Sequence, residues 1–185
     1  MKTFIFEKFI IKDKIIIDDS ISHWIDEFDK SISVSKSNKG GWQSNLLKEV
    51  PAILSEQIQD SIKRNFDVKL NVVSYWVNIN YPGSSNSEHI HPSSSISGCL
   101  YVKVPKNSGN IVFVDKEFTS YDYMCGRKNI YSIEAFDGDI LFFKSNLPHY
   151  VEENLSDSNR ISIAFNCDVE FLREGQGPKQ SHKLY

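Results

Sequence analysis

The sequence predicts a mainly β protein, an all-β jelly roll with helices packed against one face. Two observations predict this class. From residue 70 to residue 168, short apolar segments with strand character recur, separated by turn sequences. Before residue 70, the apolar residues instead recur at helical spacing. Strands this closely spaced, without crossover helices between them, indicate an antiparallel sandwich or barrel.

The length of 185 residues fits one domain at about 100–200 residues per domain. We expect a helical part over residues 1–69, a β core over 70–168 and a C-terminal arm over 169–185. In the first part, Asp19 and Ser20 can cap a helix through Trp24, Ile25 and Phe28, and residues 37–41 form a polar loop. Pro51 suits the first turn of a second helix. Its apolar face is formed by Ile53, Leu54, Ile58, Ile62 and Phe66.

The β core is predicted to contain seven strands. Turn sequences such as Pro82-Gly83 and Asp137-Gly138 separate them. The expected strands are 70–81, 96–104, 110–114, 129–135, 139–144, 149–152 and 161–167. The segment 118–127 is aromatic and irregular, and its length suits either a lid over a site or a packed surface excursion.

Composition excludes several function classes. The 21 Lys and Arg against 24 Asp and Glu give a net charge of −3, without the basic footprint of a nucleic-acid or membrane-surface protein. The three cysteines are an odd number without CxxC spacing, which argues against a disulfide framework or zinc ribbon. Cys99 and Cys167 are expected to be small buried hydrophobes. Residues 1–17 are interrupted by charges and do not resemble a signal peptide, so we expect a cytoplasmic protein with no membrane segment.

Three of the five histidines lie where a metal site would need them. His89 and His91 are two residues apart, a spacing that points both imidazoles to the same side of a strand. His149 follows Pro148 at the start of another predicted strand. Three converging imidazoles suit divalent iron and could also bind zinc, copper or nickel. The alternative is that these are solvated loop histidines.

Arg160 and Ser162 share one face of a strand whose other residues are apolar. An arginine aimed into an apolar barrel needs an anionic partner, and its planar fork suits a carboxylate. A small dicarboxylate would satisfy both Arg160 and the serine hydroxyl. Alternatively, Arg160 lies at the rim of the barrel and pairs with Glu153 or Asp157.

These residues belong to a longer ordered pattern. It contains Trp76-x-Asn78, Pro82-Gly83, His89-x-His91-Pro92, Ser97-Gly98-x-x-Tyr101-Val102, Gly109-x-Ile111-x-Phe113, Gly138-Asp139-x-Leu141-x-Phe143-x-Ser145, Leu147-x-His149-x-Val151 and Arg160-x-Ser162-x-x-Phe165-Asn166. In order and spacing, residues 70–168 resemble the iron(II)/2-oxoglutarate-dependent oxygenases, in particular a small bacterial and phage group related to prolyl hydroxylase-like enzymes. The resemblance implies a double-stranded β-helix with one Fe(II) at its open end.

The resemblance assigns metal ligands to His89, His91 and His149. His91 stands where the family usually has an aspartate or glutamate, and the loss of that negative charge is expected to weaken metal retention. Two other assignments are open. His91 could be the first ligand, with Ser93 in the carboxylate position, or Glu88 could turn inward as the carboxylate.

The resemblance also assigns 2-oxoglutarate, the cosubstrate, to Arg160 and Ser162, with Tyr101 and Asn78 completing the pocket. It implies decarboxylation of 2-oxoglutarate to succinate and hydroxylation of a small-molecule or peptide substrate with O2. The substrate itself is not readable, and a homodimer formed through the C-terminal arm is an open expectation. The competing hypotheses are a cupin-type three-histidine metal dioxygenase and a metal-free jelly-roll binding module.

Overall fold

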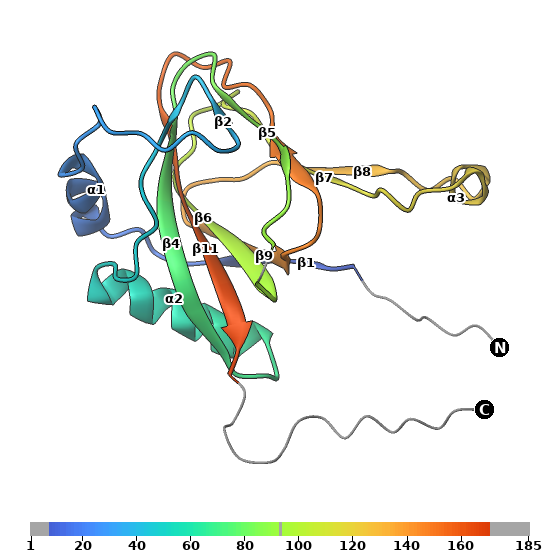
Figure 1. Ribbon diagram of the computed structural model, residues 1–185, viewed down its shortest axis with the longest axis horizontal. Helices are drawn as coiled ribbons and strands as arrows, with labels where there is room; N and C mark the ends of the chain where they lie inside the picture. Colours follow the sequence, from blue (N-terminus) through green and yellow to red (C-terminus); the bar gives the residue numbers. More distant parts are fainter. Residues whose placement is uncertain (1–7, 93, 171–185) are drawn as a thin grey trace.

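The computed structural model describes residues 8–92 and 94–170, and these form two antiparallel β-sheets with helices on one side (Figure 1). The larger sheet has the strand order β1 (Ile10–Lys14), β9 (Asp139–Lys144), β6 (Ile96–Lys103), β11 (Arg160–Val169), β4 (Leu70–Asn80) and β3 (Trp42–Gln43). The smaller sheet has the order β2 (Asn38–Lys39), β5 (Ser85–His89), β10 (His149–Val151), β7 (Ile111–Val114) and β8 (Ile130–Ile133). This arrangement confirms the predicted mainly β jelly roll.

Two helices cover the outer face of the larger sheet, α1 (Asp19–Asp26) and α2 (Ala52–Asn65). Their apolar stripes are buried in the same core as the outward side chains of β4, β6, β9 and β11. The buried helix residues are Ile21, Ile25, Leu54, Ile58 and Ile62. One face of the larger sheet therefore packs against the two helices, and its other face lines the interior of the barrel.

The interior of the barrel has a second apolar cluster, between the two sheets. Tyr101, Leu141 and Phe143 from the larger sheet meet Ile111 and Phe113 from β7 of the smaller one. Side chains alternate between the faces of a strand, so Phe142 joins the helices while Phe143 points into the barrel. The seven strands predicted from residue 70 onward are therefore all present, with ends that differ by a few residues.

The first third of the chain contains both predicted helices and also strands that were not predicted. β1 extends the larger sheet by pairing with β9, although its sequence contains Lys12, Asp13 and Lys14 and carries little strand character. Ion pairs with the neighbouring strand β9 stabilise it: the ammonium groups of Lys12 and Lys14 lie 2.8 and 3.4 Å from the buried carboxylate of Asp139. Pairing with an existing sheet edge overrides local propensity here.

Two other short strands lie where a loop was expected. The 37–41 segment contributes β2, and β3 follows directly, with Gly40 at a φ of 73° in the turn between them. β2 pairs with β5 and β3 pairs with β4, so the turn joins the edges of the two sheets. β5 was also missed, because its Ser-Asn-Ser-Glu-His sequence has no apolar alternation.

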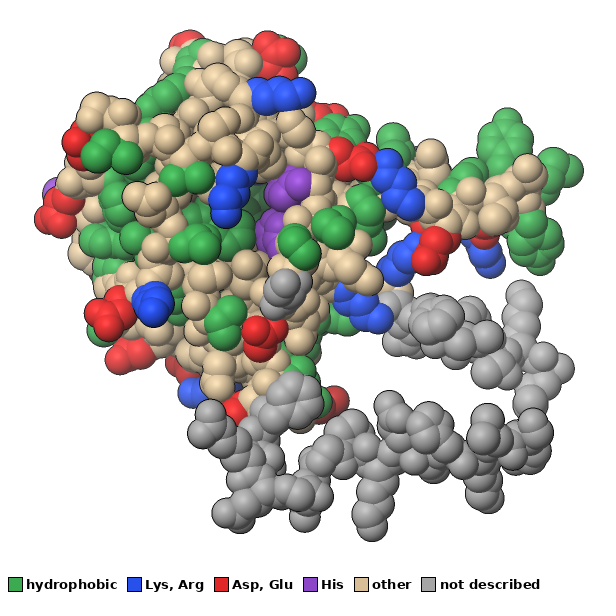
Figure 2. Space-filling view, viewed as in Figure 1, with side chains coloured by type: hydrophobic (Ala, Val, Ile, Leu, Met, Phe, Trp, Pro, Cys, Tyr) green, Lys and Arg blue, Asp and Glu red, His purple; other side chains and the backbone are tan. Residues whose placement is uncertain are grey.

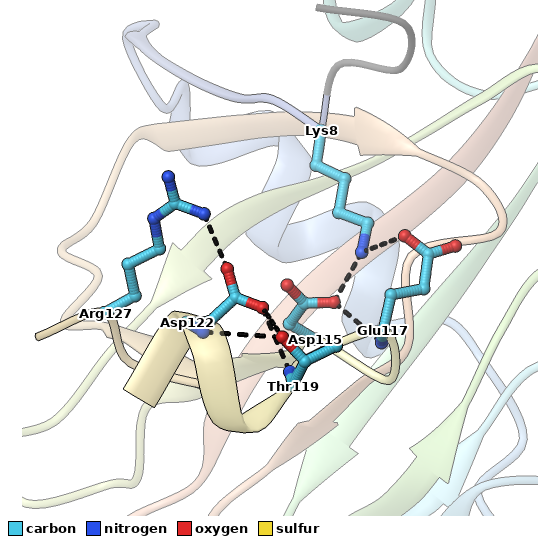
Figure 3. Close-up of polar contacts among 6 residues, drawn as sticks. All are labelled: Lys8, Asp115, Glu117, Thr119, Asp122 and Arg127. Carbon is cyan, nitrogen blue, oxygen red and sulfur yellow. Dashed lines mark hydrogen bonds and ion pairs between the residues drawn. The ribbon is translucent and has the colours of Figure 1, made fainter. Parts of the chain in front are cut away.

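The 118–127 segment forms part of a long hairpin that projects from the barrel between β7 and β8, with the short helix α3 (Ser120–Met124) at its tip (Figure 1). Figure 3 shows the polar contacts that fix its shape. Lys8 binds Asp115 and Glu117 at 2.5 and 2.8 Å, and Arg127 binds Asp122, which also closes the capping box of α3 with Thr119. The C-terminal arm lies mostly outside the described residues. No helix in the part of the chain that the structure describes is long and apolar enough to cross a membrane.

Gly98 marks the tightest packing in the centre of the larger sheet. A Cβ atom at this position would lie 2.2 Å from the ring of Phe165 and 2.8 Å from the carbonyl oxygen of Leu141. We expect Gly98→Ala to lower the free energy of unfolding by about 1–3 kcal/mol, the usual cost of overpacking a core, measured by urea denaturation. The double variant Gly98→Ala/Phe165→Leu should lose less than the sum of the two single variants. Simple additivity would contradict the packing explanation.

Candidate metal centre and cosubstrate pocket

The register of the smaller sheet brings two of the predicted histidines together. His149 begins β10 and lies directly opposite His89, the last residue of β5. Residues opposite one another on antiparallel strands have adjacent side chains, and the two ring centroids are 4.3 Å apart. The pairing of β5 with β10 therefore brings together two histidines that are sixty residues apart in the sequence.

His91 completes the cluster from just beyond the end of β5. Its ring stacks on that of His89 at 5.1 Å and lies 5.0 Å from that of His149. The three side chains can present nitrogen atoms that all lie within 4.8 Å of one another. Among the described residues this is the one group of three or more His, Cys, Asp or Glu side chains able to hold a metal ion.

Hydrogen bonds to main-chain carbonyls select the same tautomer in His89 and His149. The Nδ1 atom of His89 lies 2.8 Å from the carbonyl oxygen of Ser87, and that of His149 lies 2.9 Å from the carbonyl oxygen of Leu147. A carbonyl oxygen only accepts, so each Nδ1 must carry the proton and donate. The Nε2 lone pairs are then free, the arrangement that metal-binding histidines adopt.

His91 is supported by side chains instead of backbone. Its Nδ1 lies 3.0 Å from Oδ1 of Asn166 and 2.8 Å from Oγ of Ser97. Ser97 donates to Asn166 at 2.8 Å and contacts the Ser145 hydroxyl at 2.7 Å. These supporting residues were in the sequence pattern, but nothing in the sequence showed that β6, β9 and β11 would bring them to one histidine.

Burial keeps the three imidazoles neutral. It lowers the pKa of His149 to about 3 and that of His91 to about 4, and the nearby charge of His89 adds to both effects. The ammonium group of Lys36 also contributes to the lowered pKa of His91. Burial lowers the pKa of His89 as well. Neutral imidazole is the form that binds metals, so the cluster is ready to bind at neutral pH.

The lowered pKa values predict a stability change in the metal-free protein. In the unfolded chain the histidines take up protons near their ordinary pKa of 6.5, while buried His91 and His149 do not. The free energy of unfolding should therefore fall as pH falls below 6.5, by about 1.4 kcal/mol per pH unit for each histidine. Urea denaturation in a chelator between pH 6.5 and 5.0 measures this slope.

A variant isolates the contribution of one ring to that slope. His149→Gln should have a shallower dependence on pH than the parent protein, since one of the two most strongly shifted histidines is gone. Asp13, whose pKa is lowered to about 2, loses its stabilising charge only at lower pH and does not contribute in this range. Equal slopes for the two proteins would contradict the argument.

The four predicted cosubstrate residues lie in one pocket with the histidines. Ser162 on β11 is opposite Asn78 on β4 and Tyr101 on β6, so these three form a row across neighbouring strands. Arg160 lies two residues before Ser162 and therefore points to the same interior face. These residues and the three histidines line a single pocket, which we call the barrel pocket. Its apolar walls include Ile111, Phe143 and Val151.

Arg160 is buried in this pocket without a counter-ion. Its exposed fraction is 2%, and no carboxylate of the described residues lies within 4.0 Å of it. The predicted alternative, pairing with Glu153 or Asp157, is therefore absent. The guanidinium lies 5.0 Å from the centre of the Tyr101 ring. Its Nε, the Tyr101 hydroxyl and Oδ1 of Asn78 are buried without any hydrogen-bond partner.

Orphaned polar atoms of this kind are costly, at about 1–3 kcal/mol each and more for charged groups. Two of them, Nε of the Arg160 guanidinium and the Tyr101 hydroxyl, are donors, and an unpaired buried cation beside a second donor indicates that an anionic ligand belongs there. Oδ1 of Asn78 is an acceptor and needs a donor instead. Burial raises the pKa of Tyr101 well above its usual value, so its hydroxyl keeps its proton and can donate. The donor set fits a dicarboxylate, and the imidazole set beside it fits a divalent transition metal.

Comparison with known proteins agrees with this chemistry. A family model described as "Putative 2OG-Fe(II) oxygenase", where 2OG is 2-oxoglutarate, matches residues 74–166. The chain belongs to this family. The matched segment contains all three histidines and Arg160, and the protein is therefore a 2OG-Fe(II) oxygenase, an enzyme family that uses Fe(II), 2-oxoglutarate and O2. No curated protein sequence matches the chain.

Solved 2OG-Fe(II) oxygenases share the fold at low sequence identity. HygX from Streptomyces hygroscopicus, solved with nickel and 2-oxoglutarate bound, has a TM-score of 0.64 at 12% identity, covering 88% of this chain and 83% of its own. The carbocyclase SnoK from nogalamycin biosynthesis has a TM-score of 0.63 at 13% identity, with 87% and 79% covered. A prolyl-4-hydroxylase from Pseudomonas putida has a TM-score of 0.59 at 12% identity, with 88% and 93% covered.

The remaining site predictions have mixed outcomes. Glu88 is not part of the histidine cluster, because its carboxylate binds the Lys116 ammonium at 2.6 Å. Ser93, the other carboxylate substitute, lies outside the described residues. Cys167 is fully buried as predicted, but the prediction for Cys99 is wrong: it is only half-buried and lines the barrel pocket. It faces the interior because it lies two residues before Tyr101 on β6.

Proposed function

We propose that this oxygenase hydroxylates a C–H bond of a small-molecule substrate while decarboxylating 2-oxoglutarate. One oxygen atom of O2 enters the new hydroxyl group, and the other enters succinate as CO2 leaves. Fe(II) would be held by His89, His91 and His149. The observation that carries the proposal is the buried, unpaired Arg160 in the same pocket as these three histidines.

The cosubstrate would bind along the row of residues across β4, β11 and β6. Arg160 supplies a planar, doubly donating partner for the carboxylate remote from the metal. Ser162 and the protonated Tyr101 hydroxyl add donors, and the Asn78 amide completes the row. Fe(II) and 2-oxoglutarate, when bound, would activate O2, which is the oxidant, while the apolar walls of the barrel pocket keep water away from the reacting atoms.

The neutral ligand set has a consequence for how the binding of metal and the binding of 2-oxoglutarate affect each other. Three imidazoles leave both positive charges of a divalent metal uncompensated. The dianionic cosubstrate would bring one carboxylate to the metal, while its other carboxylate pairs with Arg160. We expect metal and 2-oxoglutarate to strengthen each other's binding, since such coupling is reciprocal.

A second candidate is a three-histidine dioxygenase of the cupin type that does not use 2-oxoglutarate. The observation in its favour is that the described metal cluster has no carboxylate ligand. It leaves the unpaired guanidinium of Arg160 unexplained, so we favour the first proposal.

Anaerobic titration separates the two candidates. Fe(II)-loaded protein is titrated with 2-oxoglutarate while the metal-to-ligand charge-transfer absorption band is followed, and O2 is then admitted and succinate is measured. A band that saturates and is followed by succinate formation supports the proposal. Fe(II) binding without the band supports the second candidate, and the absence of Fe(II) binding contradicts both.

A further inference from the structure

We propose that the substrate of this enzyme is a small carboxylate with an apolar body, bound in an open groove beside the histidine cluster. The inference rests on the proposed function and adds the chemical class of the substrate. The groove, which we call the mouth groove, has a volume of about 490 Å³. The residues that carry the argument are Lys36, Gln43, Leu46, Trp76, Glu88 and Ile90, all of which line it.

The mouth groove reaches the same histidines as the barrel pocket, from a different direction. His89, His91 and Trp76 line both cavities, whereas Arg160 lines only the barrel pocket. A molecule in the groove can therefore approach the metal ligands while Arg160 is occupied by 2-oxoglutarate. In Figure 2, histidine side chains lie at the floor of a hollow surrounded by hydrophobic side chains, with a Lys or Arg side chain at its edge.

The uncompensated charge of the groove is positive. Lys36 and Glu88 are the charged side chains in its described lining, since the histidines are neutral. Glu88 is bound to Lys116, which lies outside the groove, at 2.6 Å. No ion pair with a described carboxylate is formed by Lys36. An anionic ligand would meet one free ammonium group and no free carboxylate.

One uncharged polar side chain of the groove, Gln43, has no partner among the described residues. Gln43 is only 3% exposed, yet its side-chain amide makes no hydrogen bond to any residue that the structure describes. The amide is not among the buried unpaired groups: it lies in the lining of the groove, where a ligand can reach it. The amide can donate to a carboxylate oxygen or accept from a ligand hydroxyl, which gives the bound molecule a fixed orientation.

Part of the wall is apolar and exposed. Leu46 and Ile90 have exposed fractions of 57% and 45%, and both lie along the groove with the indole of Trp76. Covering such surface stabilises a complex by about 25 cal/mol per Å² of apolar area. An apolar body packed here would recover that free energy, while the carboxylate reaches Lys36.

Size and charge favour a small molecule over a polymer. Cavities of about 300–1,000 Å³ are typical of small-ligand sites. A nucleic acid needs several cations along its backbone, and Lys36 is the one lysine or arginine in the described lining.

The test uses Ni(II)-loaded protein with saturating 2-oxoglutarate, so that Arg160 is occupied and no turnover takes place. A panel of arylalkyl carboxylates with two to five chain carbons is titrated by calorimetry, together with the corresponding primary amides and amines. We expect at least one acid to bind more tightly than its amide and its amine. Lys36→Met should weaken that acid about fivefold, as expected for loss of an exposed ion pair, and leave the amide unchanged.

Lys39→Met is the matched control, because Lys39 is an exposed lysine three residues after Lys36, on β2, and does not line the groove. It should bind the acid like the parent protein. The inference is overturned if no acid in the panel binds, if amides or amines bind as tightly as acids, or if Lys36→Met and Lys39→Met behave alike. Titration of the Ni(II)-loaded protein with 2-oxoglutarate alone separately tests the proposed function, so the two failures are distinguishable.

Discussion

Replacing Arg160 with leucine is expected to abolish 2-oxoglutarate binding and, at the same time, to stabilise the ligand-free protein. The guanidinium is buried without a carboxylate partner, so the folded protein bears its desolvation cost whenever the pocket has no anion. Substituting an apolar side chain removes that cost, and buried charges replaced in this way have raised stability by about 1–4 kcal/mol. The cation–π contact with Tyr101 offsets part of the gain.

Two measurements test the Arg160 prediction. Affinity for 2-oxoglutarate, measured on metal-loaded protein, should fall by about 30-fold to several thousand-fold, because truncating one partner of a buried charge pair costs about 2–5 kcal/mol. Urea denaturation of the metal-free protein should give an equal or larger free energy of unfolding for the variant. Arg160→Lys keeps the positive charge but not the planar, doubly donating guanidinium, so its affinity for 2-oxoglutarate should lie between those of the parent protein and Arg160→Leu. Undiminished affinity in Arg160→Leu, or a large loss of stability, would show that this arginine is structural.

The second large effect is expected at His149. Its ring is 3% exposed and contacts both other histidines of the cluster. Alanine at this position leaves two neutral imidazoles, and we expect stoichiometric binding of Ni(II) or anaerobic Fe(II) to be lost in calorimetry. His23→Ala is the control, because His23 is an exposed histidine on α1 and should leave binding unchanged.

The opposite change is expected from His91→Asp. A carboxylate adds a negative charge to an otherwise neutral ligand set, which should tighten the binding of a divalent metal provided that the shorter side chain still reaches it.

The His149 prediction has a clear contrary outcome. If His149→Ala binds metal as tightly as the parent protein does, His149 is not a ligand of the site.

Much of the fold was predictable because the second part of the chain is locally consistent. β4 alternates apolar and polar residues over much of its length, β9 is a continuous apolar run, and both are flanked by turn residues, so pattern and turn chemistry agree. β1 and β5 have no such agreement. β1 carries three charged residues, and β5 is a polar segment. Both are strands because a neighbouring strand offers unpaired backbone groups, and that information lies elsewhere in the chain.

The site divides in the same way. His89, His91, His149 and Arg160 were recognisable from the sequence because their order and spacing identify them. The residues that surround them in the site were not recognisable in this way. The support of His91 by Ser97 and Asn166 depends on the register between β6 and β11, and the exposure of Cys99 to the pocket depends on which face of β6 turns inward. Register is a property of two strands together and cannot be read from either one alone.

The unequal support of the three histidines gives the enzyme one adjustable ligand. His89 and His149 are oriented by carbonyl groups of the main chain, which no substitution can delete. The orientation of His91 depends on two side chains, Ser97 and Asn166, that a single base change could replace. Evolution or engineering could therefore retune metal preference and electronic character through these two positions, while the frame that carries the other two ligands stays intact.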